Sequence, residues 1–468
     1  MEDVLDFSAL HLSDAMARRA LGAEDLMKAT LDRIDAVNGP VNAIVSLRDA
    51  DDLMTEARAA DTGPRSGWLH GIPLAVKDLA NAAGLPTSMG SPVFANQIAS
   101  TDDVHIARLR AAGAIVIGKT NVPEFGLGSH SFNPVHGTTA NPYAKDRTAG
   151  GSSGGAGAAL ACRMTAVADG SDMMGSLRNP AAWNNVYGMR PSWGLVPSEP
   201  VGDSFLHQLA TNGPMARTPR DLAALLDTMA GPDPRQPHGR MQAKCLPQMS
   251  PGLSGARIGW LGDWGGAYKY ASGISEASEA ALQTMRDAGA HVDDVARPME
   301  AAALWEAWTT LRSWQVACGL SALYAAHKDR LKDTAIWEIE RGMALSGMEV
   351  HRASLTRSAG FAAAAELFTR YDALVLPATQ VWPFDASIPY PTEIEGAQMD
   401  TYHRWMEVVI FASLLGLPVV SVPAGFGGPD DLPFGLQLIG ARGSDAKLLR
   451  LAEGWHQATD WPAKRRPA

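Results

Sequence analysis

The sequence predicts an α/β fold with a largely parallel or mixed sheet, and two regions carry this prediction. Between residues 70 and 125, the short β-branched runs GIPLAVKD and GAIVIGKT lie on either side of a helical segment, DVHIARLRAA, which is the pattern of strands joined by helical crossovers. Near the other end, DALVLPAT, LPVVSVPAG and LPFGLQLIG have the composition of strands, and the last two are typical of a hairpin or of neighbouring strands. The C-terminal part therefore rejoins the core.

Helices are expected before and between these strands. Residues 13–37 place apolar side chains roughly at helical spacing and predict two opening helices, with Ser13 as a candidate N-cap. The Pro/Gly-rich residues 230–255 predict a long surface connection. Residues 260–375 are rich in alanine and tryptophan and predict several helices around one early strand, ARIGWLG. Because strands return after this region, we interpret it as an insertion rather than a separate domain.

Composition and charge exclude several classes of protein. The chain has 468 residues, 46% of them hydrophobic, and a formal charge of -10 from 50 acidic and 40 basic residues. It has no block of Lys and Arg beyond the short AKRRPA tail, so we expect no nucleic-acid partner. The N-terminal MEDVLDFSAL is acidic, and no run approaches the eighteen or so apolar residues that span a bilayer, so we expect a cytoplasmic protein without a membrane partner.

Cysteine and histidine patterns do not indicate a metal site. The three cysteines, Cys162, Cys245 and Cys318, are far apart and form no CxxC pattern, so neither a disulfide framework nor a zinc site is expected. None of the 12 histidines lies in a motif, so a Ser-His-Asp triad has little support. We therefore expect no metal and no organic cofactor.

The glycine-rich stretch TAGGSSGGAGAALA, residues 148–161, matches neither GxxxxGK[ST] nor GxGxxG. The segment GAIVIGKT, residues 113–120, does match the first pattern, but its middle reads as a strand and Pro123 interrupts any helix that should follow. A flexible linker would have no reason to run directly into the helix-like GAGAALACRM. Glycines beside serines also let a substrate approach the main chain, so a catalytic turn is the remaining interpretation.

Three motifs in order, GIPLAVKD, AGGSSGGAGAALA and GSDMMGSLRNPAA, resemble those of the amidase signature family. The similarity covers most of the chain, including IARLRAAGAIVIGKTNVPEFGLGS and GLPVVSVPAGF, whereas residues 260–375 match only loosely. The resemblance implies one domain over residues 1–468, with a central mixed sheet flanked by helices on both faces as an α/β/α sandwich. It also implies a catalytic core over residues 65–220 and a core strand for the GKT segment.

The same resemblance implies the catalytic roles. Ser176 is the implied nucleophile, Ser152 the bridging serine and Lys77 the base, with a cis peptide bond between Gly151 and Ser152. The chemistry is coherent, because a lysine accepts a proton only when it is neutral, and burial behind the apolar GIPLAV run would lower its pKa. Ser152 would accept the proton of Ser176 while giving its own proton to Lys77.

The turn that leads to Ser176 is expected to form an oxyanion hole from the N–H groups of Met173, Met174, Gly175 and Ser176. Here the sequence departs from the family, which has two glycines where this chain has Met174 and Gly175. Either residue 174 needs a positive φ and methionine is strained, or it needs only a free N–H and the side chain narrows the pocket. We favour the second interpretation.

Three further polar residues near these turns are interpreted as structural support. Asp172 and Arg178 flank the nucleophile turn and are expected to pair and to hold the loop in place. Ser153 has a simpler interpretation, in which its hydroxyl hydrogen-bonds its own turn.

The substrate pocket is less sharply indicated by the sequence. We assign Phe125 and Gly151 to substrate binding and the insertion at residues 260–375 to substrate specificity. An apolar pocket that accepts an aromatic group would also draw on Met174, Trp305, Trp308 and residues 131–137. The alternative interpretation places the tryptophans in the core at helical spacing.

The activity implied by the resemblance is hydrolysis of carboxylic amide C–N bonds through an acyl-enzyme on Ser176. Small apolar or aryl amides are the expected substrates, with ester or carbamate cleavage as a side activity. Two alternatives stay open: a glutaminase subunit of a tRNA-dependent amidotransferase, which would need partner chains, and a catalytically silent binding protein on the same scaffold. The oligomeric state is not visible in the sequence, and only the frequency of symmetric pairs among soluble proteins favours a homodimer.

Overall fold

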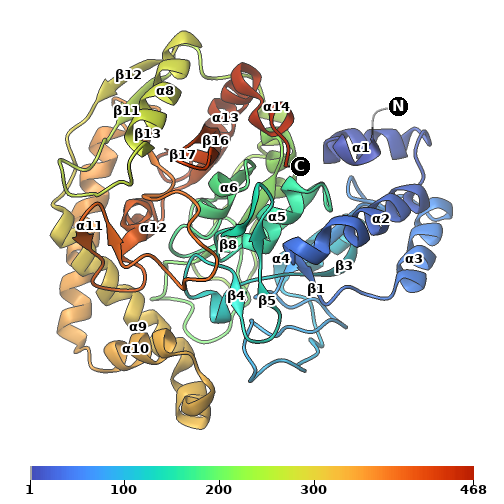
Figure 1. The fold of residues 1–468 in the computed structure, drawn as a ribbon, viewed down its shortest axis with the longest axis horizontal. Coiled ribbons are helices and arrows are strands. Elements are labelled where there is room, and N and C mark those ends of the chain that lie inside the picture. The colour runs from blue at the N-terminus through green and yellow to red at the C-terminus, as the bar shows by residue number, and fades with distance from the viewer. Residues whose placement is uncertain (1–2, 468) are drawn as a thin grey trace.

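The computed structural model describes residues 3–467 and is organised around an eight-stranded mixed sheet (Figure 1). The strand order is β12-β11-β13-β17-β16-β9-β10-β8. β11 pairs in parallel with β12 and β13, and the remaining pairs are antiparallel, so the sheet is mixed rather than largely parallel. The strands are β8 (Val167–Asp172), β9 (Tyr187–Arg190), β10 (Thr211–Ala216), β11 (Arg257–Trp260), β12 (His291–Asp294), β13 (Ala373–Pro377), β16 (Val419–Gly427) and β17 (Leu432–Ile439).

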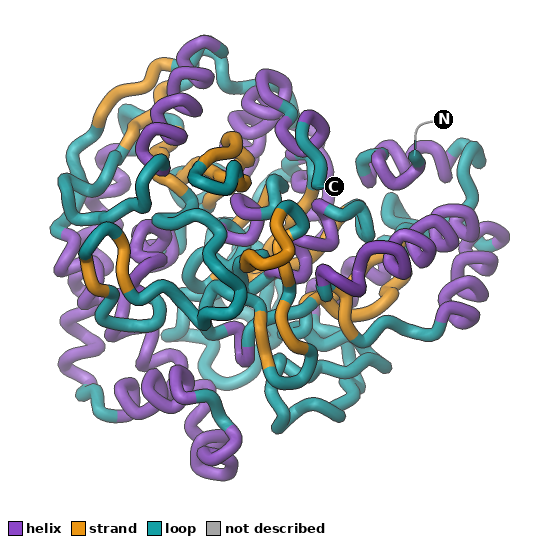
Figure 2. The backbone as a smooth tube through the Cα atoms, in the orientation of Figure 1, coloured by secondary structure: helices purple, strands orange, loops and turns teal. Residues whose placement is uncertain are grey.

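Both faces of this sheet are buried under helices, which confirms the predicted α/β/α arrangement. Along β13, Ala373 and Val375 belong to one buried apolar cluster and Leu374 and Leu376 to another, because successive side chains of a strand point to opposite faces. The first cluster includes α7 (Pro219–Met229), α8 (Ile274–Asp287) and α13 (Asp445–Thr459). The second includes α6 (Asn179–Trp183), α9 (Ala301–His327), α11 (Gly347–Leu367) and α12 (Ile410–Leu415). Figure 2 shows most strands running through the middle with helices around them.

A smaller three-stranded sheet adjoins the free side of β8 and carries the first motif. It consists of β1 (Ile44–Val45), β3 (Ile115–Thr120) and β2 (Pro73–Lys77) in that order, and α4 (Val104–Ala111) connects the parallel pair β2 and β3. The backbone N–H of Lys77 donates to Asp169 Oδ1 in β8 at 2.9 Å, which ties the two sheets together. The GKT segment is the end of β3. The residues that match the P-loop pattern therefore form a strand and not a phosphate-binding loop, as expected.

Two helices open the described chain, α1 (Ala9–Ala17) and α2 (Ala23–Val41), and α3 (Ala50–Thr62) follows. The prediction of two opening helices is confirmed, but Ser13 as N-cap is wrong. Ser8 is the N-cap, accepting from the N–H of His11 at 3.1 Å, whereas Ser13 lies inside α1 and accepts from Arg65. The helix starts five residues earlier than expected because Ser8 caps a first turn whose Ala9 and Leu12 already lie on the buried face.

The long connection and the insertion take up the middle of the chain. Between α7 and β11 the only regular element is the short turn Leu246–Gln248, as expected for residues 230–255. Residues 260–375 hold α8, α9, α10 (Asp333–Met343) and α11, and they also contain β12, a second strand that the sequence did not indicate. β12 reads HVDD and is a largely exposed edge strand, so it lacks the apolar signature of a strand.

The remaining elements are short. They are β4 (Phe132–Asn133), β5 (Gly137–Thr138), β6 (Ala140–Asn141), β7 (Ala144–Thr148), α5 (Gly154–Ala161), β14 (Glu393–Ile394), β15 (Ala397–Gln398) and α14 (Trp461–Lys464). Within residues 3–467, no helix has the length and apolarity needed to cross a membrane. In the same range, His, Cys, Asp and Glu side chains form no group of three or more that could hold a metal ion.

We predict that Gly155→Ala destabilises the protein. A Cβ at this position would overlap the backbone nitrogen of Asn121 and lie 2.5 Å from the backbone oxygen of Ala43, so α5 would have to move away from β3. The expected loss in free energy of unfolding is about 1 to 3 kcal/mol. Gly319→Ala, in an open and exposed part of α9, is the matched control and should be stabilising by about 0.5 to 1 kcal/mol. Equal urea midpoints for the two variants would contradict the close contact between α5 and β3.

Candidate active site

The structure brings the three motif residues to one cavity of about 130 Å³. Lys77 ends β2, Ser152 lies in the loop before α5, and Ser176 follows the turn after β8. Ser152 and Ser176 line the cavity and are 2% and 6% exposed, and Lys77 lies behind them, 1% exposed. Apolar side chains of the wall include Leu79, Phe125, Leu127, Met173, Met174 and Met406.

The Lys77 ammonium group is surrounded by neutral oxygen acceptors. Its Nζ donates to Ser152 Oγ and to Ser153 Oγ at 2.8 Å each, and to the hydroxyl and carbonyl oxygens of Ser171 at 3.0 and 3.2 Å. Burial lowers the pKa of Lys77 to about 7, against the opposing pull of Asp169 and Asp172. Near neutral pH this lysine is therefore divided between its neutral and charged forms.

The loop that carries Ser152 is held by contacts to the nucleophile turn. The Gly151–Ser152 peptide bond is cis, as the resemblance implied. Ser129 Oγ donates to the carbonyl of Gly151 at 2.7 Å and accepts from Asn179 Nδ2 at 3.0 Å. The N–H of Ser153 donates to the carbonyl of Ser176 at 3.2 Å. These bonds fix the two serine-bearing loops relative to each other.

Two serines that contact Lys77 were not identified as its neighbours from the sequence. Ser153 does not hydrogen-bond its own turn: its hydroxyl contacts Lys77 Nζ, because the start of α5 turns the side chain toward β2. Ser171 contacts the same nitrogen from β8, and it stands in the GSD of the third motif, where its place at the end of a buried strand was an available signal.

The nucleophile turn settles the question posed by Met174. Gly175 has a φ of +85°, whereas the φ of Met174 is not positive, so the methionine backbone is not strained there. Its side chain is 3% exposed and forms part of the cavity wall. The interpretation in which Met174 narrows the pocket is the one that fits.

The backbone donors of this turn are fewer than expected. The N–H of Gly175 donates to Asp172 Oδ1 at 2.9 Å and is therefore not free for a substrate oxygen. Within residues 3–467, the N–H groups of Met173, Met174 and Ser176 have no acceptor. Of the four expected oxyanion donors, the N–H of Gly175 instead shapes the turn, and the other three stay candidates.

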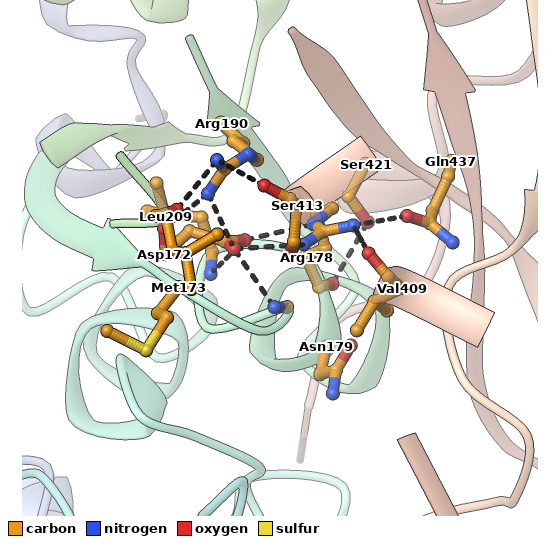
Figure 3. A network of polar contacts seen from close by, with 12 residues as sticks. Asp172, Met173, Arg178, Asn179, Arg190, Leu209, Val409, Ser413, Ser421 and Gln437 are labelled. Carbon is orange, nitrogen blue, oxygen red and sulfur yellow. Dashed lines mark hydrogen bonds and ion pairs between the residues drawn. The ribbon is translucent and has the colours of Figure 1, made fainter. Parts of the chain in front are cut away.

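Asp172 anchors the turn, and Figure 3 shows its contacts with Arg178 and Arg190. Arg178 donates to both carboxylate oxygens at 2.9 Å, confirming the expected pair, and Arg190 lies 3.4 Å from Oδ1. All three side chains are fully buried. Burial alone would raise the pKa of Asp172, but the two guanidinium groups hold it well below its ordinary range. Arg178 also donates to Gln437 Oε1 of β17 and to Ser413 Oγ of α12.

Only some of the residues expected to form the substrate pocket line the cavity. Phe125 lines the cavity, whereas Gly151 is not part of its wall and is engaged through its carbonyl. Trp308 is fully buried in the core and Trp305 packs against Arg404, so neither reaches this cavity. Residues 131–137 also lie outside its wall. The core interpretation of these tryptophans was therefore the better one.

The insertion contributes to the cavity through a residue that sequence reasoning did not identify. Arg312 of α9 is 3% exposed and lines the cavity beside the Met173 side chain. A single arginine among helical alanines and tryptophans carries no motif, so no signal in the sequence pointed to it.

Comparison with known proteins gives consistent results over nearly the whole chain. A family model described as Amidase matches residues 25–449. A glutamyl-tRNA(Gln) amidotransferase subunit of Thermus thermophilus is 35% identical, covering 95% of each chain. An acylamidase of Rhodococcus erythropolis is 32% identical, covering 98% of this chain and 97% of its own. The crystal structure of a bacterial aryl acylamidase of the amidase signature family superposes with a TM-score of 0.90 at 27% identity, covering 98% of this chain and 99% of that one.

We predict that Asp172→Asn destabilises the fold. The substitution leaves the guanidinium groups of Arg178 and Arg190 buried without a counter-charge, which should lower the free energy of unfolding by about 3 to 5 kcal/mol. Asp32→Asn, at an exposed ion pair with Lys28, is the matched control and should change it by less than about 1 kcal/mol. Chemical denaturation measures both. A loss for Asp172→Asn as small as that of the control would mean that the buried pair does not anchor the turn.

Proposed function

The chain belongs to the amidase signature family and is an amide C–N hydrolase, and on that premise we propose that it forms an acyl-enzyme on Ser176. The observation that carries the proposal is the buried Lys77, whose Nζ is 2.8 Å from Ser152 Oγ, behind the cavity that Ser176 lines. A lysine with a pKa near 7 can take up a proton at neutral pH, which an exposed lysine cannot do efficiently.

The proton relay runs along these three side chains. Neutral Lys77 accepts the hydroxyl proton of Ser152, and Ser152 accepts that of Ser176 as the Ser176 oxygen attacks the amide carbonyl carbon. No hydrogen bond joins the two serine hydroxyls among the described contacts, and catalytic hydrogen bonds of this kind often tighten only when the substrate is bound. The N–H groups of Met173, Met174 and Ser176 are positioned to stabilise the oxyanion, each well-placed donor contributing about 3 to 4 kcal/mol.

Collapse of the tetrahedral intermediate reverses the relay. The C–N bond breaks, the leaving nitrogen takes a proton from Ser152, and Lys77 returns its proton to Ser152. Water then attacks the acyl-enzyme carbonyl with Lys77 and Ser152 again serving as the base, so that a carboxylic acid is released and Ser176 is restored.

Cavity size and lining support small apolar or aryl acyl groups as substrates. A volume of about 130 Å³ is close to that of an apolar protein cavity of about 150 Å³ that holds benzene. A second cavity of about 580 Å³, lined in part by Trp193, His207 and Trp314, shares Ala210 with the first and offers room for a larger group. Because esters and carbamates present the same carbonyl, we propose their cleavage as a side activity.

A glutaminase subunit of a tRNA-dependent amidotransferase is the second candidate, because a relative of that description is 35% identical over most of the chain. Ammonia release from glutamine that depends on an added partner subunit, with no activity on aryl amides, would favour it over the first candidate. A silent binding protein is disfavoured because Met174 forms a wall of the cavity and does not fill it. The homodimer and the cytoplasmic location stay predictions.

We predict that Ser176→Ala reduces kcat on a panel of p-nitroanilides, primary amides, an aryl ester and an aryl carbamate by at least about a thousandfold, because the acyl-enzyme can no longer form. Ser354→Ala, at an exposed position of α11, is the matched control and should retain wild-type rates. Trapping of the acyl group on wild type but not on Ser176→Ala, by mass spectrometry, would identify the nucleophile. Residual turnover in Ser176→Ala close to wild type would assign the nucleophile elsewhere.

The pH dependence of kcat/KM should report Lys77. Only the neutral amine acts as base, and burial lowers its pKa to about 7, so kcat/KM should rise as pH increases through about 7 and then level off. Lys77→Arg keeps the positive charge at every accessible pH and should be inactive across the profile. Lys269→Arg, at an exposed lysine, should reproduce the wild-type curve. A wild-type profile that is flat between about pH 5 and 9 would be incompatible with Lys77 as the base.

A further inference from the structure

Arg312 is a charged side chain in the wall of the catalytic cavity that the proposed relay does not use. It projects from α9, in the insertion, and is 3% exposed. Its Nη1 lies 3.5 Å from the sulfur of Met173, which also lines the cavity. Arg312 Nη1 therefore faces the part of the cavity wall that the Met173 side chain forms.

Two of the three guanidinium nitrogens of Arg312 donate to oxygen acceptors, and the third does not. Its Nε donates to both oxygens of Glu338 at 3.1 and 3.2 Å, and its Nη2 donates to the hydroxyl of Tyr402 at 2.7 Å. The contact of Nη1 is a thioether sulfur, which is a weak acceptor. Buried arginine N–H groups ordinarily find oxygen partners, so Nη1 is a donor prepared for an oxygen that a ligand would bring.

Glu338 keeps this arginine charged and fixed. Glu338 is fully buried and also accepts from Ser313 and Tyr402. Burial alone would raise the pKa of Glu338, but the neighbouring guanidinium lowers it below its ordinary value. The pair therefore holds a rigid, charge-compensated donor at the cavity wall, where a neutral acceptor oxygen can bind without adding net charge.

We propose that Arg312 Nη1 forms a subsite for a second oxygen acceptor in the acyl part of the substrate, in addition to the scissile carbonyl. The proposal rests on the proposed amidase activity and names its substrate class: amides whose acyl chain carries a further carbonyl or carboxylate oxygen. A buried donor that is left without a partner penalises substrates that lack the acceptor, and a hydrogen bond to a charged group is stronger than a neutral one.

Primary amides of matched shape test the subsite. The first set is pentanamide, 4-oxopentanamide and succinamate, which differ only in an alkyl, a ketone or a carboxylate at the far end. The second set is one carbon longer and consists of hexanamide, 5-oxohexanamide and glutaramate. The measured quantity is the ratio of kcat/KM for an acceptor-bearing amide to kcat/KM for its alkyl counterpart. A damaged fold lowers both values together and leaves this ratio unchanged.

The expected wild-type ratio is about tenfold or more in at least one set. In the double variant Arg312→Met/Glu338→Gln, which removes both charges together, the ratio should fall to about one. Glu338→Gln alone is the matched control, because it keeps the donor. Its ratio of kcat/KM for the ketone to kcat/KM for the alkyl amide should stay at the wild-type value. Its ratio for the carboxylate should rise, because the guanidinium loses its counter-charge. The comparison of the ketone with the carboxylate in wild type then shows which kind of oxygen the subsite prefers.

Either of two results overturns the subsite: wild-type ratios near one in both sets, or a double variant that keeps the wild-type ratio. If the double variant does not fold, Arg312→Lys keeps the charge opposite Glu338 but loses the planar fork, and the same fall in the ratio is expected. If wild type hydrolyses none of these amides, the proposed activity is judged on the p-nitroanilides, the aryl ester and the aryl carbamate, and the subsite is tested by binding. In that case tighter calorimetric binding of 4-oxopentanamide than of pentanamide to Ser176→Ala, lost on Arg312→Lys, still supports the subsite, and equal binding rejects it.

Discussion

The site depends on the hydrogen bonds and ion pairs that the buried carboxylate of Asp172 makes. This carboxylate lies at the end of β8 and accepts from the N–H groups of Gly175 and Leu177 and from the side chain of Arg178, so that it defines the path of the nucleophile turn. Through Arg178 it is connected to α12 and β17, and through Arg190 to β9. A charge this deeply buried is stable only with such partners, so the turn holds its shape because the sheet around it is complete.

The same arrangement makes a lysine base workable. Two carboxylates favour the charged form of Lys77. The negative charge on Asp172 is taken up by two arginines, whereas Asp169 accepts from the backbone N–H of Lys77 and lies 3.5 Å from His105 Nε2. The direct neighbours of Lys77 Nζ are instead hydroxyl and carbonyl oxygens of Ser152, Ser153 and Ser171. Burial then outweighs the attraction of the carboxylates, and the pKa of Lys77 falls to about 7.

The residues proposed for catalysis and the residue proposed for selectivity come from different parts of the chain. Lys77, Ser152 and Ser176 belong to a stretch of about a hundred residues built on β2, α5 and β8, whereas Arg312 of α9 and Met406, which also line the cavity, come from a later part of the chain. Members of one family can therefore share the catalytic residues while the acyl group they accept varies with the inserted helices. This separation matches the loose similarity of residues 260–375 to an otherwise recognisable sequence.

The sequence by itself determined the family, six strands (β2, β3, β11, β13, β16 and β17) and, through motifs that resemble those of the family, the three residues proposed for catalysis. Each of these strands is encoded in a short apolar run and each of these residues in a short motif, whereas β8, β9, β10 and β12 were not indicated. The sequence also indicated the Asp172–Arg178 pair, whose members are six residues apart. Tertiary structure alone decided that Ser153 and Ser171 contact Lys77, that Asp172 occupies the N–H of Gly175, that Trp305 and Trp308 lie away from the cavity, and that Arg312 enters it. The Asp172–Gly175 contact joins residues three apart and depends on the shape of the turn. The other outcomes depend on packing between segments distant in the chain, such as the 139 residues that separate Arg312 from Met173, and a local sequence pattern does not encode such contacts.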